Sequence, residues 1–351
     1  MAKKKYYDIT NLFNTGAQYM MLLGQRANGK SYQVKHKVIE EFLENGSKFI
    51  YLRRWQRDIK TAAVEKYFDD VDIPKITNGE WEGIYCWQGS IYLYKVNDKG
   101  KKIKKEMGMY CALNEAERYK SWAFVGFDNI IYEEFITDQA YLPNEPTRLQ
   151  QFISTVVRLN TAHVYLVGNT LSRVCPYFNE WSLEGTIKQK QGTIEIYHYH
   201  DFDGDVIDIA VENCANTANQ NKMFFGRAGK QIVTGEWDVK NMPKLLQPLE
   251  NYEMIYEVLL EYQSFKFVLQ LLVEPEDGGR LIYVYPYTGH RHINRKLSDV
   301  FSDKPNISRK LNRAKKPEFY MIDCILNDKI CFSDNLTGTD FMTVLGAMKI
   351  W

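Results

Sequence analysis

The sequence has no apolar run long enough to cross a membrane, no internal repeat and no low-complexity segment. Its 6 cysteines are scattered without a Cys-x-x-Cys pair, and no cysteine or carboxylate set completes a zinc site. The formal net charge is only +1, which excludes a strongly basic protein of the histone kind but allows a local basic patch. We therefore expect a soluble, cytosolic protein with no membrane partner, and 351 residues suggest two domains.

A loop near the amino terminus has the spacing of a phosphate-binding motif. Gly24 to Ser31 read Gly-Gln-Arg-Ala-Asn-Gly-Lys-Ser, which is the Walker A pattern. The apolar run 19–23 precedes the loop and predicts a strand. The apolar spacing over 34–43 predicts an amphipathic helix that stops at Asn45-Gly46. A strand, this loop and a helix in that order predict a site for a nucleoside triphosphate.

The chemistry of the loop assigns a role to its parts. Its glycines allow a tight turn, so that successive backbone N–H groups and the start of a helix surround the β-phosphate. Lys30 would reach the β- and γ-phosphates, and the Ser31 hydroxyl would ligate Mg²⁺. We therefore expect ATP and Mg²⁺ as cofactors. The predicted binding residues are Gly24, Asn28, Gly29, Lys30, Ser31 and Tyr32.

The pattern after this loop alternates between strands and helices. Strands are expected at 48–52, 129–132 and 163–167, with helices at 58–68 and 147–158. Between them, 91–94 and 107–113 flank the turn-forming stretch 97–100 and predict a β-hairpin at the sheet edge. This alternation predicts an α/β fold with a mostly parallel sheet. We assign residues 1–200 to a P-loop ATPase domain.

The rest of the chain divides into a polar stretch and a smaller domain. From 201 to 250 the pattern weakens, and we expect a connecting subdomain there. Strands are expected at 265–273, 281–287 and 320–326, and a helix at 339–348. These elements predict a small α/β domain over 251–351.

Two adjacent acids follow one of the predicted strands. Asn129 to Tyr132 has the pattern of a buried strand and ends in Glu133-Glu134. In a P-loop ATPase, the first acid at such a strand end holds Mg²⁺ and the second polarises the attacking water. The usual aspartate of the first position is Glu133 here, one methylene longer, and Asp128 stays an alternative. The acids alternatively belong to a solvated loop.

Two further polar residues follow the predicted elements. Asn169 comes just after the strand 163–167, where a side chain can sense the γ-phosphate, or it caps the turn made with Gly168. Arg158 ends the helix 147–158. An arginine at a domain edge can reach the γ-phosphate of a neighbouring subunit, although a surface arginine is the default interpretation.

Several motifs, in this order along most of the chain, resemble the genome-packaging ATPases of phi29-like tailed bacteriophages. Each is short, and their order is the specific signal. They are Gly-x-Arg-x-x-Gly-Lys-Ser, the segment 49–54, the segment 130–136 with its double acid, Thr155-Val156-Val157-Arg158, Asn169, Pro176-Tyr177-Phe178, Phe225-Gly226-Arg227 and Phe332-Ser333-Asp334-Asn335.

This resemblance implies a fold, a reaction and a set of partners. It implies a RecA-like, additional-strand ATPase domain in a homopentameric ring that moves double-stranded DNA into a procapsid. Arg158 then matches the trans-acting arginine finger and Glu134 the catalytic glutamate, while Arg26 and Arg53 match arginines near the nucleotide. The implied partners include the phage portal and a packaging RNA, and the implied location is the cytoplasm of an infected bacterium.

The same family carries an RNase H-like carboxyl-terminal domain. Nuclease chemistry on that fold needs clustered carboxylates, usually beginning within the first strand, to hold two metal ions. The segment 265–273, taken as that strand, contains Lys266 and Gln270 but no carboxylate. We therefore expect a vestigial nuclease domain that serves for docking.

Basic residues gather in three places. The densest group lies in the predicted hairpin and suits contact with DNA phosphates, although a solvated turn explains it equally well. Its members are Lys99, Lys101, Lys102, Lys104 and Lys105. Arg57 and Lys60 form a second candidate, and the basic stretch 309–316 a third that could meet DNA or RNA.

The sequence is compatible with three functions. The first is a DNA-packaging motor that hydrolyses ATP between adjacent subunits. The second is another P-loop translocase or helicase, which would use the same site chemistry with different partners. The third is an ATP-gated assembly protein with little turnover.

Overall fold

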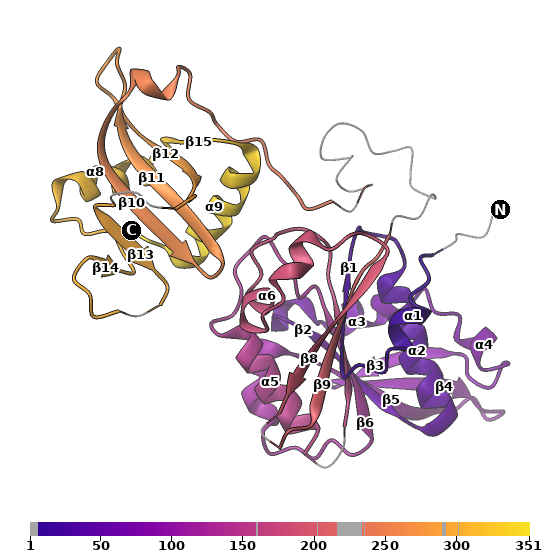
Figure 1. Ribbon diagram of the computed structural model, residues 1–351. Coiled ribbons are helices and arrows are strands. Elements are labelled where there is room, and N and C mark those ends of the chain that lie inside the picture. Colours follow the sequence, from indigo (N-terminus) through magenta and orange to yellow (C-terminus); the bar gives the residue numbers. More distant parts are fainter. Residues whose placement is uncertain are drawn as a thin grey trace. The chain divides into compact units, whose positions relative to one another are not determined.

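A computed structural model describes residues 6–158, 161–201, 203–215, 234, 236–289, 293–300 and 302–351. The chain divides into two compact units, whose strands and helices can be followed in Figure 1. The first unit comprises 1–137, 141–171 and 185–236, and the second comprises 138–140, 172–184 and 237–351. The segment 172–184, with its short helix α6 (Pro176–Glu180), therefore groups with the carboxyl-terminal residues rather than with the sheet that precedes it.

The first unit is built on a nine-stranded sheet in the order β3-β4-β5-β2-β6-β7-β1-β9-β8. Strands β5, β2, β6, β7, β1 and β9 are parallel neighbours, and the edges β3-β4-β5 and β8-β9 are antiparallel. The predicted α/β fold with a mostly parallel sheet is confirmed. The strands are β1 (Tyr19–Leu23), β2 (Lys48–Arg53), β3 (Gly83–Trp87), β4 (Ser90–Val96), β5 (Lys102–Ala112), β6 (Phe127–Glu133), β7 (His163–Val167), β8 (Thr193–His200) and β9 (Val206–Asn213).

Helices and 3-10 segments connect these strands. Helix α2 follows β1 after a short loop, and it buries Val34, Val38, Ile39 and Phe42 at helical spacing. It ends at Gly46, whose left-handed backbone lets its N–H bond to the carbonyl of Phe42, as the Asn45-Gly46 stop predicts. The segments are α1 (Thr10–Phe13), α2 (Lys30–Asn45), η1 (Gln56–Asp58), α3 (Thr61–Phe68), α4 (Ile73–Ile76), η2 (Leu113–Tyr119), α5 (Glu145–Val156) and η3 (Glu184–Lys188).

The second unit contains a six-stranded sheet in the order β14-β13-β10-β11-β12-β15. Strands β10, β11 and β12 are antiparallel, whereas β13 is parallel to β10 and β14 is parallel to β13. One apolar cluster joins this sheet to residues of the two helices. The elements are η4 (Leu249–Asn251), β10 (Glu253–Tyr262), β11 (Phe265–Val273), β12 (Arg280–Pro286), β13 (Arg295–Ser298), β14 (Ile307–Ser308), α8 (Lys316–Leu326), β15 (Ile330–Phe332) and α9 (Asn335–Met348).

The structure contradicts a predicted strand and a predicted connecting subdomain. The predicted strand 320–326 is part of helix α8, which starts after Lys315 with a proline in its first turn and buries Met321, Ile322 and Ile325. A short apolar run fits either structure, and here the buried spacing is helical. The predicted connecting subdomain 201–250 begins with β9, which pairs with β1 in the first sheet. Among the described residues, no helix is both long and apolar enough to span a membrane.

Candidate active site

The Walker A segment forms a tight loop between β1 and α2. Gly24 and Gly29 have φ angles of +135° and +99°, and Ala27 also has a positive φ, so the loop depends on left-handed backbone. Gly29 occupies the cap position, so that α2 begins at Lys30. The predicted strand, loop and helix are all present, and they direct the first N–H groups of α2 toward the loop.

Lys30 lies inside this loop with its side chain buried. Its Nζ donates to the carbonyl of Gln25 at 2.6 Å, to Oδ1 of Asn28 at 3.1 Å and to Oδ1 of Asn169 at 3.4 Å. Burial lowers the pKa of Lys30 to about 8, and the neighbouring Cys214 and Glu133 oppose this shift. The ammonium is therefore held by neutral oxygens, which an anionic phosphate can replace.

The paired acids meet the loop because their strand lies close to β1 in the sheet. Strand β6 ends at Glu133 and is separated from β1 by β7 alone. Since these strands are parallel, their carboxyl ends share one edge of the sheet. Asp128 lies at the opposite end of β6, near its start, and does not line the cavity around the Walker A loop. The structure thus brings Glu133, rather than the alternative Asp128, beside the loop.

Glu133 is held by a defined set of polar neighbours. Only 7% of it is exposed, and the hydroxyl of Tyr67 donates to its Oε1 at 2.7 Å. Burial raises the pKa of Glu133, and hydrogen bonds from the side chains of Tyr67 and Ser31 oppose this rise. The charges of Arg53 and Lys30 act in the same direction as those hydrogen bonds. The carboxylate is therefore fixed next to the predicted Mg²⁺ ligand Ser31.

Glu134 has a different environment from that of Glu133. Its side chain is 59% exposed, and its Oε2 lies 2.5 Å from Nη2 of Arg53. Its backbone has a φ of +58°, which is uncommon for a residue with a side chain. Backbone strain of this kind is maintained where neighbouring groups hold the chain, and here the N–H of Glu134 donates to the carbonyl of Val167 at 2.8 Å.

A buried arginine fixes the chain just after β6. The Nε and Nη2 groups of Arg54 donate to Glu145 at 2.7 and 3.0 Å, as a two-pronged pair. The same guanidinium donates to the carbonyls of Glu134 and Phe135 at 3.1 and 2.7 Å. Tyr132 also donates its hydroxyl to Glu145. This network sets the direction in which Glu134 leaves the sheet.

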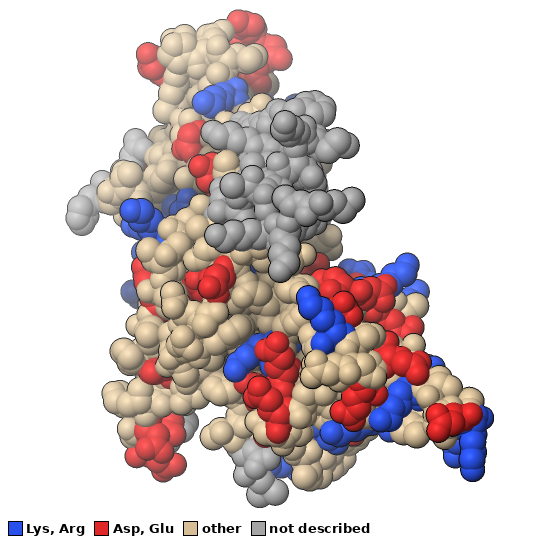
Figure 2. Space-filling view, turned by 90° about the vertical axis from the view of Figure 1, so that its right-hand side faces the viewer, with Lys and Arg blue, Asp and Glu red and all other residues tan. Residues whose placement is uncertain are grey.

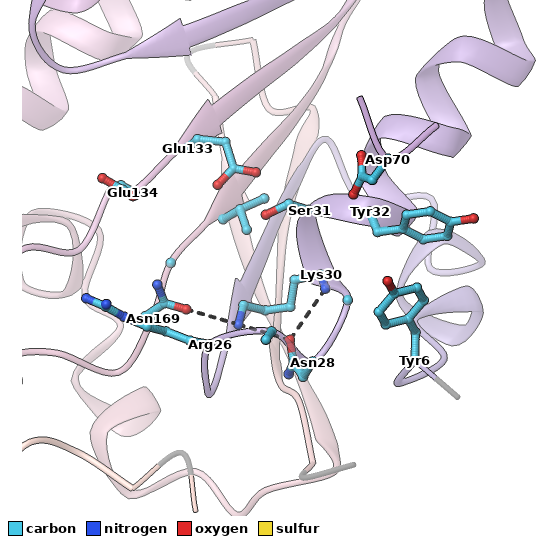
Figure 3. A pocket seen from close by; sticks show the side chains of 14 residues that line it. Tyr6, Arg26, Asn28, Lys30, Ser31, Tyr32, Asp70, Glu133, Glu134 and Asn169 are labelled. Atoms are coloured by element: carbon cyan, nitrogen blue, oxygen red, sulfur yellow. Dashed lines mark hydrogen bonds between the residues drawn. The ribbon is translucent and has the colours of Figure 1, made fainter. Parts of the chain in front are cut away.

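The loop, the acids and Asn169 surround one cavity of about 270 Å³. Figure 3 shows Glu134 and Asn169 at one end of this cavity, Tyr6, Tyr32 and Asp70 at the other, and Lys30 between them. Of the predicted site residues, it gathers Arg26, Asn28, Gly29, Lys30, Ser31, Tyr32, Glu133, Glu134 and Asn169. Gly24 and Arg53 are absent from this lining; Arg53 instead contacts Glu134.

The cavity fits a nucleoside triphosphate with a divalent cation. The buried Lys30 ammonium and the N-terminus of α2 supply positive character for phosphates. Nδ2 of Asn28, which lines the cavity, is buried without a hydrogen-bond partner among the described residues. The oxygens of Ser31 and Glu133 are ligands of the kind that Mg²⁺ prefers. These residues would hold ATP and Mg²⁺, and the bound cation would neutralise charge on the phosphates.

The structure adds residues that the sequence did not single out. Tyr6 and Asp70 line the cavity, and Tyr67 contacts Glu133 from α3. The ring of Tyr6 lies 4.7 Å from that of Tyr32, measured between centroids. No sequence motif marks these residues, because each belongs to a segment outside the Walker A loop and the strand end and reaches the site only through folding.

Arg158 does not line the cavity. Its Nη2 donates to the backbone carbonyl of Lys120 at the end of η2, so it rests on its own chain. The motif Phe225-Gly226-Arg227 lies outside the described residues.

The predicted DNA-contacting lysines divide into different environments. Lys102 lies over the rings of Tyr85 and Tyr94, and Lys104 lies over those of Trp87 and Tyr92. Lys105 instead packs over Phe42 of α2. Lys99 and Lys101 are exposed at the hairpin turn, and Arg57 and Lys60 are exposed before α3. Figure 2, seen from the side of α2, α4 and β4, shows basic residues interspersed with acidic ones over this face.

The parallel sheet and the Walker A loop at the end of β1 define a P-loop protein. The family described as podovirus DNA encapsidation protein (Gp16) matches residues 1–232 of the 351. The chain belongs to this family, as the motif order in its sequence indicates.

Curated relatives are DNA packaging proteins of Bacillus phages. That of Bacillus phage B103 is 29% identical over 316 residues, covering 80% of this chain and 89% of the relative. That of Bacillus phage phi29 is 26% identical over 251 residues, covering 69% and 67%. The alignment with the phage B103 protein thus extends over most of both chains.

Solved structures share the fold. A chain of the bacteriophage Phi-29 viral genome packaging motor assembly matches with a TM-score of 0.55 and 20% identity, covering 98% of this chain and 99% of the other. A chain of the Phi-28 gp11 DNA packaging motor matches with a TM-score of 0.53 and 15% identity, covering 99% of both. At these identities the comparison shows a common fold.

Proposed function

We propose that this chain is the ATP-hydrolysing subunit of a motor that moves double-stranded viral DNA into a procapsid. Membership of the DNA encapsidation family supports this function. The observation that carries the proposal is the cavity in which Lys30 and Ser31 meet Glu133 and Glu134. In this arrangement Lys30 binds phosphate, Ser31 and Glu133 hold Mg²⁺, and Glu134 orients the attacking water, with Asn169 next to Lys30 as the phosphate sensor.

The central test is DNA-stimulated ATP hydrolysis by the full chain. Linear double-stranded DNA is expected to stimulate turnover, and Glu134→Gln is expected to abolish it while ATP binding persists. An ATP-gated assembly protein would instead bind ATP with little turnover, in the wild-type chain as well as in Glu134→Gln. Packaging of DNA into procapsids then separates a packaging motor from a helicase, since a helicase would unwind duplex DNA and leave procapsids empty.

We further propose that the chain acts as a homopentameric ring with Arg158 as a trans-acting finger. Arg158 does not line the nucleotide cavity of its own subunit, which supports a role at the cavity of a neighbouring subunit. Mixed rings of Glu134→Gln and Arg158→Ala subunits test this role. If Arg158 acts in trans, some mixed rings pair an intact cavity with an intact arginine and recover hydrolysis that both parents lack. Wild-type hydrolysis by Arg158→Ala rings would rule out the finger.

For DNA contact we propose the hairpin lysines Lys99, Lys101, Lys102 and Lys104, with Arg57 and Lys60 as a second site; Lys105, which packs over Phe42, is left out of this proposal. Replacing Lys99 and Lys101 by glutamine is expected to weaken DNA binding for all sequences and to reduce its salt dependence, because each phosphate contact releases counterions. Lys105→Gln is the matched control, since Lys105 packs over Phe42. Equal losses in both variants would count against specific contact by the turn. The portal and a packaging RNA are proposed partners during assembly in the host cytoplasm.

The carboxyl-terminal unit is proposed to be an RNase H-like domain without nuclease activity. If strands β10 to β14 are numbered 1 to 5 along the chain, their order across the sheet is 5-4-1-2-3. This strand order supports an RNase H-like fold. The first strand is β10 rather than 265–273, and it carries the buried Glu257, so the argument from an absent carboxylate does not hold. Glu257 contacts Gln270 and Tyr285 instead. Among the described residues no cluster of His, Cys, Asp and Glu could hold a metal ion.

Nuclease assays with Mg²⁺ and Mn²⁺ test this proposal. Incubation of the full chain with linear and circular DNA is expected to leave both intact. Cleavage that Glu257→Gln removes would overturn the proposal and assign nuclease chemistry to β10.

A further inference from the structure

Tyr67 contacts the acid at the end of β6 although it belongs to no part of the nucleotide-binding motifs. It lies in the last turn of α3, more than 60 residues before Glu133 in sequence. Its hydroxyl donates to Oε1 of Glu133 at 2.7 Å. A half-buried side chain that is bonded to a candidate metal ligand can control where that ligand points.

The position of the Tyr67 hydroxyl is fixed from several sides. Its ring stacks on that of Tyr51 in β2, with centroids 4.3 Å apart and planes at 27°. Lys35 of α2 donates to the backbone carbonyl of Tyr67 at 2.5 Å, and its ammonium lies 4.5 Å from the ring centroid. Lys35 also pairs with Asp70, just after α3. The end of α3 is thus tied to both β2 and α2.

Glu133 needs such a contact more than an aspartate would. The additional methylene adds a torsion, so the longer carboxylate has more positions available beside the loop. Burial also makes an unbonded carboxylate costly, and the hydrogen bonds from Tyr67 and Ser31 relieve that cost. Together they select one orientation, with Oε1 occupied by Tyr67.

We propose that Tyr67 is a positioning residue that fixes the long side chain of Glu133 where its carboxylate can hold the Mg²⁺ of a bound nucleotide. This inference rests on the proposed role of Glu133 in ATP hydrolysis. It assigns to α3 a part in cation binding that the Walker A loop and the strand end do not explain.

The test compares Tyr67→Phe in two backgrounds, wild type and Glu133→Asp. Phenylalanine keeps the ring that stacks on Tyr51 and removes only the hydroxyl. The affinity for a fluorescent ATP analogue is measured by titrating the protein with the analogue, first in buffer that contains Mg²⁺ and then in buffer that contains EDTA. In the wild-type background we expect Tyr67→Phe to weaken binding about tenfold with Mg²⁺ and to leave binding in EDTA unchanged, because a hydrogen bond to a charged group is lost.

The second background separates positioning from packing. The aspartate of Glu133→Asp is one methylene shorter and is expected to fall short of the Tyr67 hydroxyl. Adding Tyr67→Phe to this background is then expected to change Mg²⁺-dependent affinity by less than about twofold. The control is Tyr110→Phe, which removes a hydroxyl bonded to Thr61 at the start of the same helix at 2.9 Å and does not touch Glu133. Its affinities are expected to match those of wild type under both conditions.

Each outcome decides one question. A Tyr67→Phe protein with wild-type Mg²⁺-dependent affinity overturns the inference, as does an equal loss in the Glu133→Asp background or in Tyr110→Phe. Glu133→Gln tests the underlying role separately. If Glu133→Gln also leaves Mg²⁺-dependent binding unchanged, the proposed role of Glu133 fails; if only Tyr67→Phe does, the positioning role alone fails.

Discussion

Nη2 of Arg53 lies 2.5 Å from Oε2 of Glu134, so the last residue of β2 is paired with the residue just after β6. The two strands are parallel neighbours, which brings their carboxyl ends to one edge of the sheet. Glu134 is the more exposed of the two acids, and this ion pair orients a side chain that would otherwise move in solvent. Arg53 therefore does not line the cavity itself but contacts the proposed catalytic glutamate, which does.

We predict that Arg53→Ala lowers kcat for ATP hydrolysis more than it lowers ATP affinity. Misplacement of a catalytic group by about 1 Å can cost about two orders of magnitude in rate, and a fall of that size is expected here. Steady-state kinetics and direct ATP titration measure the two effects. Arg118→Ala, which removes an exposed arginine paired with Glu115, is the control. A large loss of ATP affinity with unchanged kcat would instead make Arg53 a nucleotide-binding residue.

We predict that Gly29→Ala is far more damaging than Gly46→Ala. Both glycines cap α2 with positive φ, but a Cβ at Gly29 would lie 2.6 Å from atoms of Tyr6, whereas none lies within 4 Å at Gly46. Gly46→Ala is expected to cost about 1 kcal/mol of unfolding free energy from backbone strain alone. Gly29→Ala is expected to reduce ATP affinity by at least about tenfold as well, because the loop must shift to relieve the contact.

Thermal unfolding and ATP titration check this pair of variants. Adding Tyr6→Gly to Gly29→Ala removes every contacted side-chain atom, including the Cβ of Tyr6, and is expected to restore part of the affinity. Equal behaviour of the two single variants would show that the contact with Tyr6 has no effect.

We predict that Arg54→Met destabilises the first unit by about 3–5 kcal/mol, because it removes the partner of a buried carboxylate. Arg54 is 5% exposed and Glu145 1%. Urea unfolding followed by circular dichroism measures the change. Arg118→Met, at an exposed ion pair, is expected to stay within about 0.5 kcal/mol of wild type. A similarly small effect of Arg54→Met would mean that the network around Glu134 is dispensable for folding.

We predict that Asp340→Asn removes a pH dependence from the stability of the second unit. Burial raises the pKa of Asp340 in α9 to about 6; Arg173, whose Nη1 lies 3.8 Å from Oδ2, opposes this rise. Between the unfolded pKa of 3.8 and the folded value, the folded state binds more protons. Stability therefore falls as pH rises through this range, by about 3 kcal/mol in all, and stays lower above it.

Calorimetry between pH 4 and 7 measures this effect. Asp340→Asn is expected to remove most of this fall in stability with rising pH. Asp323→Asn, on the outside of α8, is expected to leave the pH profile unchanged. An unaltered pH profile in Asp340→Asn would assign the dependence to other groups.

Features encoded in neighbouring residues were predictable from the sequence. The Walker A loop needs glycines at two positions and a lysine and serine after them, all within Gly24 to Ser31, so spacing alone reveals it. Strand β7 spans His163–Val167, the bounds predicted from the apolar run that follows His163. Helix α8 was missed because an apolar run of that length satisfies a strand and a helix equally, and only packing selects between them.

What the sequence by itself determined is thus the phosphate-binding loop, the two acids at the end of β6 and the family to which the chain belongs. The tertiary structure decided which groups reach these residues: Arg53 beside Glu134, Tyr67 on Glu133, and Tyr6 and Asp70 in the cavity. The physical reason is that the loop is formed by local backbone geometry, whereas these contacts depend on parallel strand order and on how α3 packs against β2 and α2.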